Sequence, residues 1–328
     1  MSLENAYLGD RVESHDCAPE ADAVFFRQHG FCAIRNLISN EMIEHLKRVI
    51  AGTANGTTFD TIKKNTYNTA IDDPAIHGFL GQRTFAALIG SLGYRDSVFT
   101  DGVIFETDAE LGGFDWHLDI TSFKYIFPKD RAFSIWITLD PIDPDVQDGG
   151  LTLLSTSSFS GSEFFNLQAT VTRSLVEGRY KIPALYKTLL GPKYRNDEQK
   201  KFKKLFPYIQ SKFPHLFSDS IYISGFAKNL FDSEGVSFSL APGDAILFDK
   251  NVFHRSNALL PGVMATRRAF VLRFIEADAR FAATNASKAG GDDARLVERM
   301  TQGLSEGERF DLTGATVINV PEPAEKTA

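Results

Sequence analysis

The 328-residue sequence contains little cysteine and no long apolar run. Its two cysteines, Cys17 and Cys32, form no C-x-x-C motif, which excludes a disulfide-stapled fold and fits a reducing compartment. No segment approaches the roughly 18–20 apolar residues that a membrane-spanning helix requires. Residues 1–10 lack the apolar core of a signal peptide. We therefore expect a cytoplasmic protein without a membrane span.

A net positive charge is also absent. The formal charge of −7 argues against a general nucleic-acid binder, and nothing in the sequence indicates an oligomeric state. Phenylalanine, in contrast, is abundant, with 28 residues. We interpret this abundance as a core built from aromatic-rich strands.

The chain is organised around Phe114–Ile120, an apolar and aromatic run that contains His117 and Asp119. The run predicts a β-strand, in which residues two apart project from the same face. An imidazole beside a carboxylate is a natural pair of metal ligands. Two histidines and one carboxylate suit non-haem Fe(II) oxygen chemistry, because they leave coordination positions open.

The second histidine in a suitable context is His254. It follows a Pro-Gly-Asp turn at 242–244 and a short apolar strand predicted at Ala245–Phe248. It lies so far along the chain from His117 that only a fold returning the chain beside itself brings the two together. Our hypothesis is that His117, Asp119 and His254 bind Fe(II).

Predicted strands recur every ten or so residues over 97–155 and again over 237–275, with few helices between them. This spacing favours an antiparallel β-sandwich or barrel. Before them, the sequence predicts a helix at Ala21–His29 and another that Ser39 or Asn40 caps and Gly52 ends. Residues 53–80 are typical of a loop, and the run Lys63–Thr69 within it is either solvated or reaches a ligand.

The middle of the chain interrupts the strand pattern. Residues 179–212 hold ten Lys or Arg and only two acidic residues, with apolar residues interleaved. We interpret the middle as a partly helical, lid-like insert. Its charge is explained either by a solvated helix face or by a basic rim for an anionic substrate.

Six motifs together resemble one enzyme family. The sequence is similar to the phytanoyl-CoA dioxygenase-like branch of the Fe(II)/2-oxoglutarate-dependent oxygenases, over roughly residues 22–280 with an unmatched middle. The matching stretches are Trp116–Asp119, Ser134–Asp140, Asp148–Ser155, Pro242–Asp244, His254–Asn257 and Arg267–Phe274.

The resemblance implies a mainly β fold with flanking helices, whose core is a double-stranded β-helix, the cupin-like jelly roll. We expect a single oxygenase domain over 1–328. Residues 1–97 would form a helical N-terminal support, 98–156 and 237–276 the jelly-roll core, 157–236 the lid-like insert and 277–328 a C-terminal extension.

The resemblance also implies a cosubstrate site. Arg267 matches the arginine that holds the distal carboxylate of 2-oxoglutarate, a role that suits its planar fork. Strict alternation keeps Arg268 open as the alternative, because Arg267 shares the less apolar face of its strand. Ser256 matches a position that hydrogen-bonds the cosubstrate. Trp136 matches an aromatic position facing the metal, and plain core packing explains it equally well.

The implied activity is that of an Fe(II)/2-oxoglutarate-dependent dioxygenase. With O₂, it would convert 2-oxoglutarate to succinate and CO₂ and oxidise an unactivated C–H bond of a small organic substrate in secondary or specialised metabolism. Halogenating relatives lack the carboxylate, so Asp119 favours hydroxylation, desaturation or cyclisation. Two alternatives stay open: a metal-dependent jelly-roll isomerase or lyase without 2-oxoglutarate, and a non-catalytic ligand-binding jelly roll.

Overall fold

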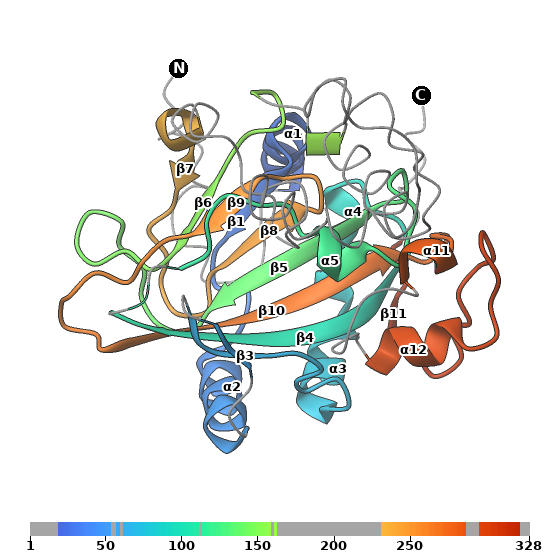
Figure 1. Cartoon of the computed structure of the whole chain (residues 1–328), viewed down its shortest axis with the longest axis horizontal. Helices are drawn as coiled ribbons and strands as arrows, with labels where there is room; N and C mark the ends of the chain where they lie inside the picture. Colours follow the sequence, from blue (N-terminus) through green and yellow to red (C-terminus); the bar gives the residue numbers. More distant parts are fainter. Residues whose placement is uncertain are drawn as a thin grey trace, which may run out of the picture.

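The computed structural model describes residues 19–53, 57–59, 62–109, 111, 113–158, 161–162, 231–286 and 295–321 (Figure 1). The basic run at 179–212 falls outside these residues. The lid-like insert therefore stays a prediction.

A large antiparallel sheet forms the centre of the described chain (Figure 1). Its strand order is β1-β8-β5-β10-β4-β3-β2, with β11 paired to β4, and a smaller sheet has the order β7-β6-β9. The strands are β1 (Phe31–Ile34), β2 (Thr57–Phe59), β3 (Ile62–Thr66), β4 (Ser97–Asp108), β5 (Ala132–Thr138), β6 (Leu151–Leu153), β7 (Val236–Ser237), β8 (Ala245–Asp249), β9 (His254–Ser256), β10 (Thr266–Glu276) and β11 (Val317–Ile318).

Helices flank the large sheet, with α2 and α3 below it in Figure 1. The Ser39 side chain caps α2 by accepting from the backbone N–H of Met42, as the sequence predicted. The helices are α1 (Pro19–His29), α2 (Asn40–Gly52), α3 (Pro74–Leu80), α4 (Arg83–Ser91), α5 (Ile120–Phe123), α11 (Ala283–Ala286) and α12 (Arg295–Thr301).

The prediction of a loop over 53–80 was wrong. Strand β3 pairs with β4 through this stretch, and α3 begins after Asp73, whose carboxylate accepts from the backbone N–H of Ala75. Local composition favoured a loop, but pairing with a long buried strand overrides such weak preferences.

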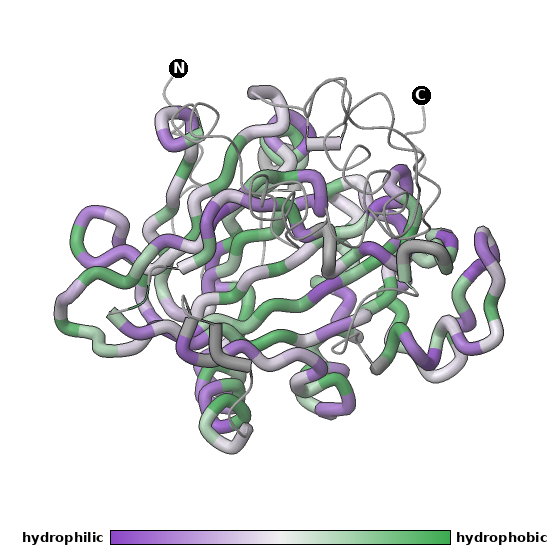
Figure 2. Tube along the Cα trace, viewed as in Figure 1, coloured by the Kyte–Doolittle hydropathy of each residue, from purple (hydrophilic) through white to green (hydrophobic). Residues whose placement is uncertain are grey.

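Two apolar clusters lie on opposite faces of the large sheet. Along β5, Ile135 and Ile137 pack with the helices, whereas Trp136 packs toward the smaller sheet. Along β10, Phe270 likewise belongs to the helix side and Val271 to the inner side. Hydrophobic residues accordingly dominate the central strands in Figure 2. Residues on the inner side between the two sheets can form a site.

The Pro-Gly-Asp turn fixes the start of β8. The buried carboxylate of Asp244 accepts from Arg35 Nη1 at 2.6 Å and from the backbone N–H of Asn36 at 2.8 Å. Gly243 has φ +89°, and a Cβ there would lie 2.8 Å from the backbone oxygen of Ile38. Glycine therefore lets the turn approach the chain that follows β1.

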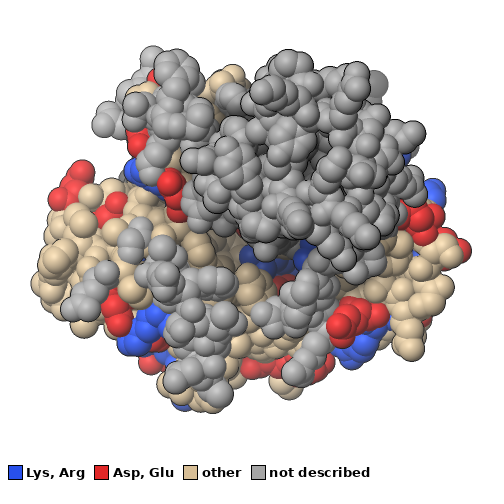
Figure 3. Space-filling view, viewed as in Figure 1, with Lys and Arg blue, Asp and Glu red and all other residues tan. Residues whose placement is uncertain are grey.

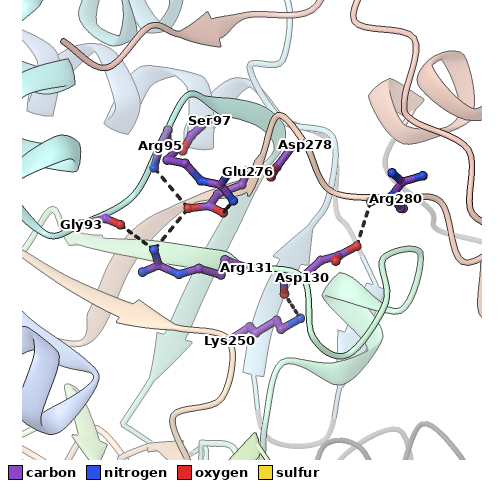
Figure 4. Close-up of polar contacts among 9 residues, drawn as sticks. All are labelled: Gly93, Arg95, Ser97, Asp130, Arg131, Lys250, Glu276, Asp278 and Arg280. Carbon is purple, nitrogen blue, oxygen red and sulfur yellow. Dashed lines mark hydrogen bonds and ion pairs between the residues drawn. The ribbon is translucent and has the colours of Figure 1, made fainter. Parts of the chain in front are cut away.

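A charged cluster joins the ends of β5 and β10 (Figure 4). Glu276 is 2% exposed, and its carboxylate accepts hydrogen bonds from Arg95 Nη2 at 3.0 Å and Arg131 Nη1 at 3.2 Å. Arg95 also reaches Asp278, which is much more exposed than Glu276. The cluster thus balances a carboxylate buried at the edge of the core.

We expect Glu276→Gln to lower the free energy of unfolding by about 2 kcal/mol, since hydrogen bonds to charged groups contribute in that range. Urea denaturation measures the change. The matched control is Asp278→Asn, which removes the exposed carboxylate and should cost less than about 0.5 kcal/mol. Equal urea midpoints for the parent and Glu276→Gln would contradict the assigned role.

Surface charges of both signs are interspersed over the described residues in Figure 3. Among the helices that the structure describes, none has the length and hydropathy needed to cross a membrane. A basic rim, in contrast, was predicted only for residues outside this part of the chain.

Candidate metal centre

The structure brings His117, Asp119 and His254 together. One ligand atom from each lies within 4.8 Å of the others. The backbones of the two histidines pair directly, with N–O distances of 2.9 and 3.0 Å. The three residues that the sequence analysis predicted as metal ligands therefore form one cluster, between the large and the small sheet.

The local conformation differs from the prediction. Phe114–Ile120 is not a strand: His117 makes an isolated bridge to His254, and Asp119 is the N-cap residue of α5. The two side chains converge because the chain bends at Trp116, pairs with His254 at His117 and enters α5 at Asp119. They do not converge by strand alternation.

Gly113 explains how this segment approaches β9. Its φ is +72°, and a Cβ there would lie 2.1 Å from the backbone oxygen of Ser256. The Ser256 N–H donates to the carbonyl of Phe114 at 2.9 Å. A side chain at position 113 would therefore push His117 away from His254.

Both histidines have a fixed tautomer. His117 Nδ1 lies 2.7 Å from the Asp115 carbonyl, and His254 Nδ1 lies 3.0 Å from the Val252 carbonyl. Because a carbonyl only accepts, each Nδ1 carries the hydrogen and each Nε2 keeps its lone pair for a metal. Burial, together with the neighbouring His117, lowers the pKa of His254 to about 4, so this imidazole is neutral at pH 7.

Asp119 is held as a carboxylate. Ser134 Oγ donates to its Oδ2 at 3.0 Å, and His254 Nε2 lies 3.8 Å from its Oδ1. Burial has the largest single effect and would raise the pKa of Asp119. The guanidinium of Arg273, the two histidines and the Ser134 hydrogen bond together outweigh burial and hold that pKa below its usual range. The triad therefore offers two imidazole nitrogens and one anionic oxygen.

Arg267 lies on the inner face of β10 and is 1% exposed. Its Nη2 lies 3.4 Å from Ser256 Oγ, and its Cζ lies 5.3 Å from the centroid of the Trp136 ring. Its Nε and Nη1 have no hydrogen-bond partner among the described residues. Burial lowers its pKa to about 10, so the guanidinium remains charged at neutral pH.

Arg268 lies on the other face. Its Nε and Nη2 donate to the Asp140 carboxylate at 2.9 and 2.6 Å. Strict alternation had kept it as an alternative because Arg268 shares the more apolar face of β10. The structure shows that the helices cover this apolar face, and that Arg267 rather than Arg268 points to the inner side, where Ser256 and Trp136 lie.

Ser256 and Trp136 also lie at the inner side. Ser256 follows His254 on β9 with one residue between, and its hydroxyl is the one neighbour to which Arg267 is bonded among the described residues. Trp136 is buried in the inner apolar cluster and lies beneath Arg267. Trp136 therefore packs in the core and also lies beside Arg267, so both interpretations of this residue hold.

The sequence reasoning missed Arg273 and Asp101. Arg273 Nη1 lies 3.2 Å from Asp101 Oδ2, and its Nη2 lies 4.0 Å from Asp119 Oδ1. The signal was present in the sequence, because Arg273 stands six residues after Arg267, on the same face of the strand by alternation, between Leu272 and Phe274. A second arginine on the buried inner face predicts an anionic partner, because an unpaired buried charge is costly.

No family model matches the sequence, and no curated protein matches it. Solved structures do match. The epimerase SnoN, solved with Fe3+, alpha ketoglutarate and nogalamycin RO, superposes with a TM-score of 0.56 at 12% identity, covering 92% of this chain and 99% of that one.

Two further enzymes are similar. EctD from S. alaskensis in its apo form gives a TM-score of 0.54 at 15% identity, with 88% of each chain covered. SnoK, a non-heme alpha ketoglutarate dependent carbocyclase, gives 0.51 at 11% identity, with 90% of this chain and 94% of that one covered. The predicted fold is thereby confirmed: the chain has a jelly-roll core with flanking helices, like these enzymes.

Proposed function

We propose that this protein is an Fe(II)/2-oxoglutarate-dependent oxygenase that oxidises an unactivated C–H bond of a small organic substrate. One observation carries the proposal. Arg267 is a buried cation whose Nε and Nη1 have no hydrogen-bond partner among the described residues, and it points to the inner side, where the His–Asp–His cluster lies. The proposal is therefore supported by a cluster that could hold a metal ion and by a buried arginine on the inner side of the large sheet.

The triad fits a ferrous ion. His117 and His254 would bind through Nε2, and Asp119 through one carboxylate oxygen. Two imidazoles and a carboxylate leave positions open for a cosubstrate and O₂. A structural zinc site, in contrast, is closed by four protein ligands, and only these three described residues form such a cluster.

Arg267 fits the distal carboxylate of 2-oxoglutarate. A guanidinium buried without an anion is costly, because its desolvation is not repaid. A carboxylate would receive two parallel hydrogen bonds from the planar fork, and Ser256 could donate a third. Asp140 already satisfies Arg268, which leaves Arg267 as the available cation.

When bound, iron and 2-oxoglutarate supply the oxidation of the substrate by O₂, with 2-oxoglutarate converted to succinate and CO₂. The chain's own residues bind and orient these groups, and the apolar cluster around Trp136 keeps water away. Enzymes that share this fold include an epimerase and a carbocyclase. We therefore propose the class, with hydroxylation, desaturation or cyclisation as its outcome, in one cytoplasmic oxygenase domain.

The test is an anaerobic titration of the apoprotein with Fe(II) and 2-oxoglutarate. We expect the weak visible charge-transfer absorption of the chelate, followed by succinate formation when O₂ is admitted. A folded, iron-loaded protein that gives neither signal would refute the proposal. It would then favour the metal-dependent isomerase or lyase, or the ligand-binding protein.

A further inference from the structure

Asp101 and Arg273 form a buried ion pair beside the His117–Asp119–His254 cluster. They are register partners on β4 and β10, and their side chains are only 6% and 5% exposed. Arg273 bridges two carboxylates, with Nη1 3.2 Å from Asp101 and Nη2 4.0 Å from Asp119. The pair is therefore a neighbour of Asp119 and lies in the same desolvated region.

Other contacts hold the pair in place. The backbone N–H of Asn68 donates to Asp101 Oδ1 at 2.9 Å. Arg273 Cζ lies 5.6 Å from the centroid of the Tyr67 ring. Its Nε has no hydrogen-bond partner among the described residues. Tyr67 and Asn68 belong to the run Lys63–Thr69, so the end of that run contacts this ion pair.

The charges of the three side chains leave one net negative charge. Asp101 and Asp119 are anionic, and Arg273 is cationic. Charges buried at such short range interact strongly, because little water screens them. Without Asp101, Arg273 would cancel Asp119, and the cluster would lose its attraction for a divalent cation. Without Arg273, two carboxylates would attract the cation more strongly, but the positive charge beside Asp119 would no longer offset them, and Arg267 alone would face an anionic group bound there.

We propose that Asp101 and Arg273 are a charge-balancing pair that sets the affinity of the site for its two ligands, with Arg273 as a positioning residue for Asp119. Asp101 keeps the site attractive to a divalent metal. Arg273 keeps the loaded site attractive to an anionic cosubstrate. This inference rests on the proposed function, since it assumes that a divalent ion and a dicarboxylate bind there.

The pair predicts opposite effects for two single substitutions. Asp101→Asn removes a negative charge with little change of shape, and should weaken Co(II) binding by at least about tenfold. Arg273→Gln removes the positive charge, and should tighten Co(II) binding while weakening 2-oxoglutarate binding to the Co(II)-loaded protein by about tenfold. Arg273→Lys keeps the charge and should stay within about threefold of the parent for both ligands.

The double variant Asp101→Asn with Arg273→Gln gives the sharpest comparison. It restores the net charge of the parent cluster, so its affinity for Co(II) should return to within about threefold of the parent. A purely structural role for the ion pair predicts the reverse, because both single variants would weaken binding and the double variant would be no better.

Isothermal titration calorimetry at pH 7.5 measures the Co(II) and 2-oxoglutarate affinities, and circular dichroism checks folding. Arg268→Gln is the matched control, because it removes an arginine of the same strand on the opposite face. If the parent and this control bind no Co(II), the proposed function fails. If they bind it but Asp101→Asn and Arg273→Gln do not shift the affinity in opposite directions, the charge-balancing inference alone fails. If Arg273→Gln does not fold, the other two variants decide the inference. Asp101→Asn must then weaken Co(II) binding by at least about tenfold, while Arg273→Lys stays within about threefold of the parent.

Discussion

An Arg267→Gln protein will bind divalent metal about as tightly as the parent, yet lose roughly a hundredfold or more in affinity for 2-oxoglutarate. The reason is that no carboxylate among the described residues is hydrogen-bonded to this guanidinium, although Asp140 and Asp148 lie close enough to act on its charge. The guanidinium is buried against Trp136, and two of its nitrogens have no partner among the described residues. A bound carboxylate would satisfy both at once, and glutamine offers neither the charge nor the fork.

Titration of 2-oxoglutarate into the metal-loaded protein measures this loss. Arg268→Gln is the natural comparison, since it changes the adjacent residue and breaks an ion pair to Asp140 on the other face. We expect that variant to keep its affinity for 2-oxoglutarate. A loss confined to Arg268→Gln would show that the cosubstrate is bound elsewhere.

Asp119→Asn will reduce the affinity for divalent metal by more than about a hundredfold, beyond the range typical for residues that only support a ligand. An amide has nearly the shape of a carboxylate but carries no charge and is a poorer ligand. Ser134 can still donate to the remaining carbonyl oxygen, so the local fold should persist. The change therefore isolates the charge and donor strength of a single oxygen.

Equilibrium dialysis against Fe(II) under anaerobic conditions measures the metal bound per chain. Asp115→Asn serves as the control, because Asp115 belongs to the same segment but accepts from the backbone N–H of Trp116 and lies outside the cluster. Full metal occupancy in Asp119→Asn would remove this carboxylate from the ligand set.

The positions of several buried strands along the chain were predictable, whereas their order in the sheet was not. Apolar runs such as the one ending at Phe248 and the long run through Val271 have few alternatives once the turns around them are recognised. The convergence of His117 with His254 was also anticipated, although nothing local determines it. That prediction depended on chemistry, because two imidazoles and a carboxylate in apolar segments together make a suitable ligand set for one metal ion.

The local geometry was not predictable. The prediction of a strand at 114–120 failed because an isolated bridge and a helix cap replace regular alternation there. The face of β10 was equally ambiguous, because both faces are buried and only tertiary packing tells which one the helices cover. Arg273 was overlooked for the same reason, since its role depends on Asp101, which is distant in sequence.

The backbone bridge between His117 and His254 has a consequence for the fold as a whole. His254 belongs to the smaller sheet, whereas Asp119 is tied to Ser134 in the larger one. An ion bound to all three would act as a cross-link that closes a long loop and fastens one sheet to the other. Metal occupancy and the free energy of unfolding would then be linked, so that a higher concentration of free metal would raise the stability of the folded chain.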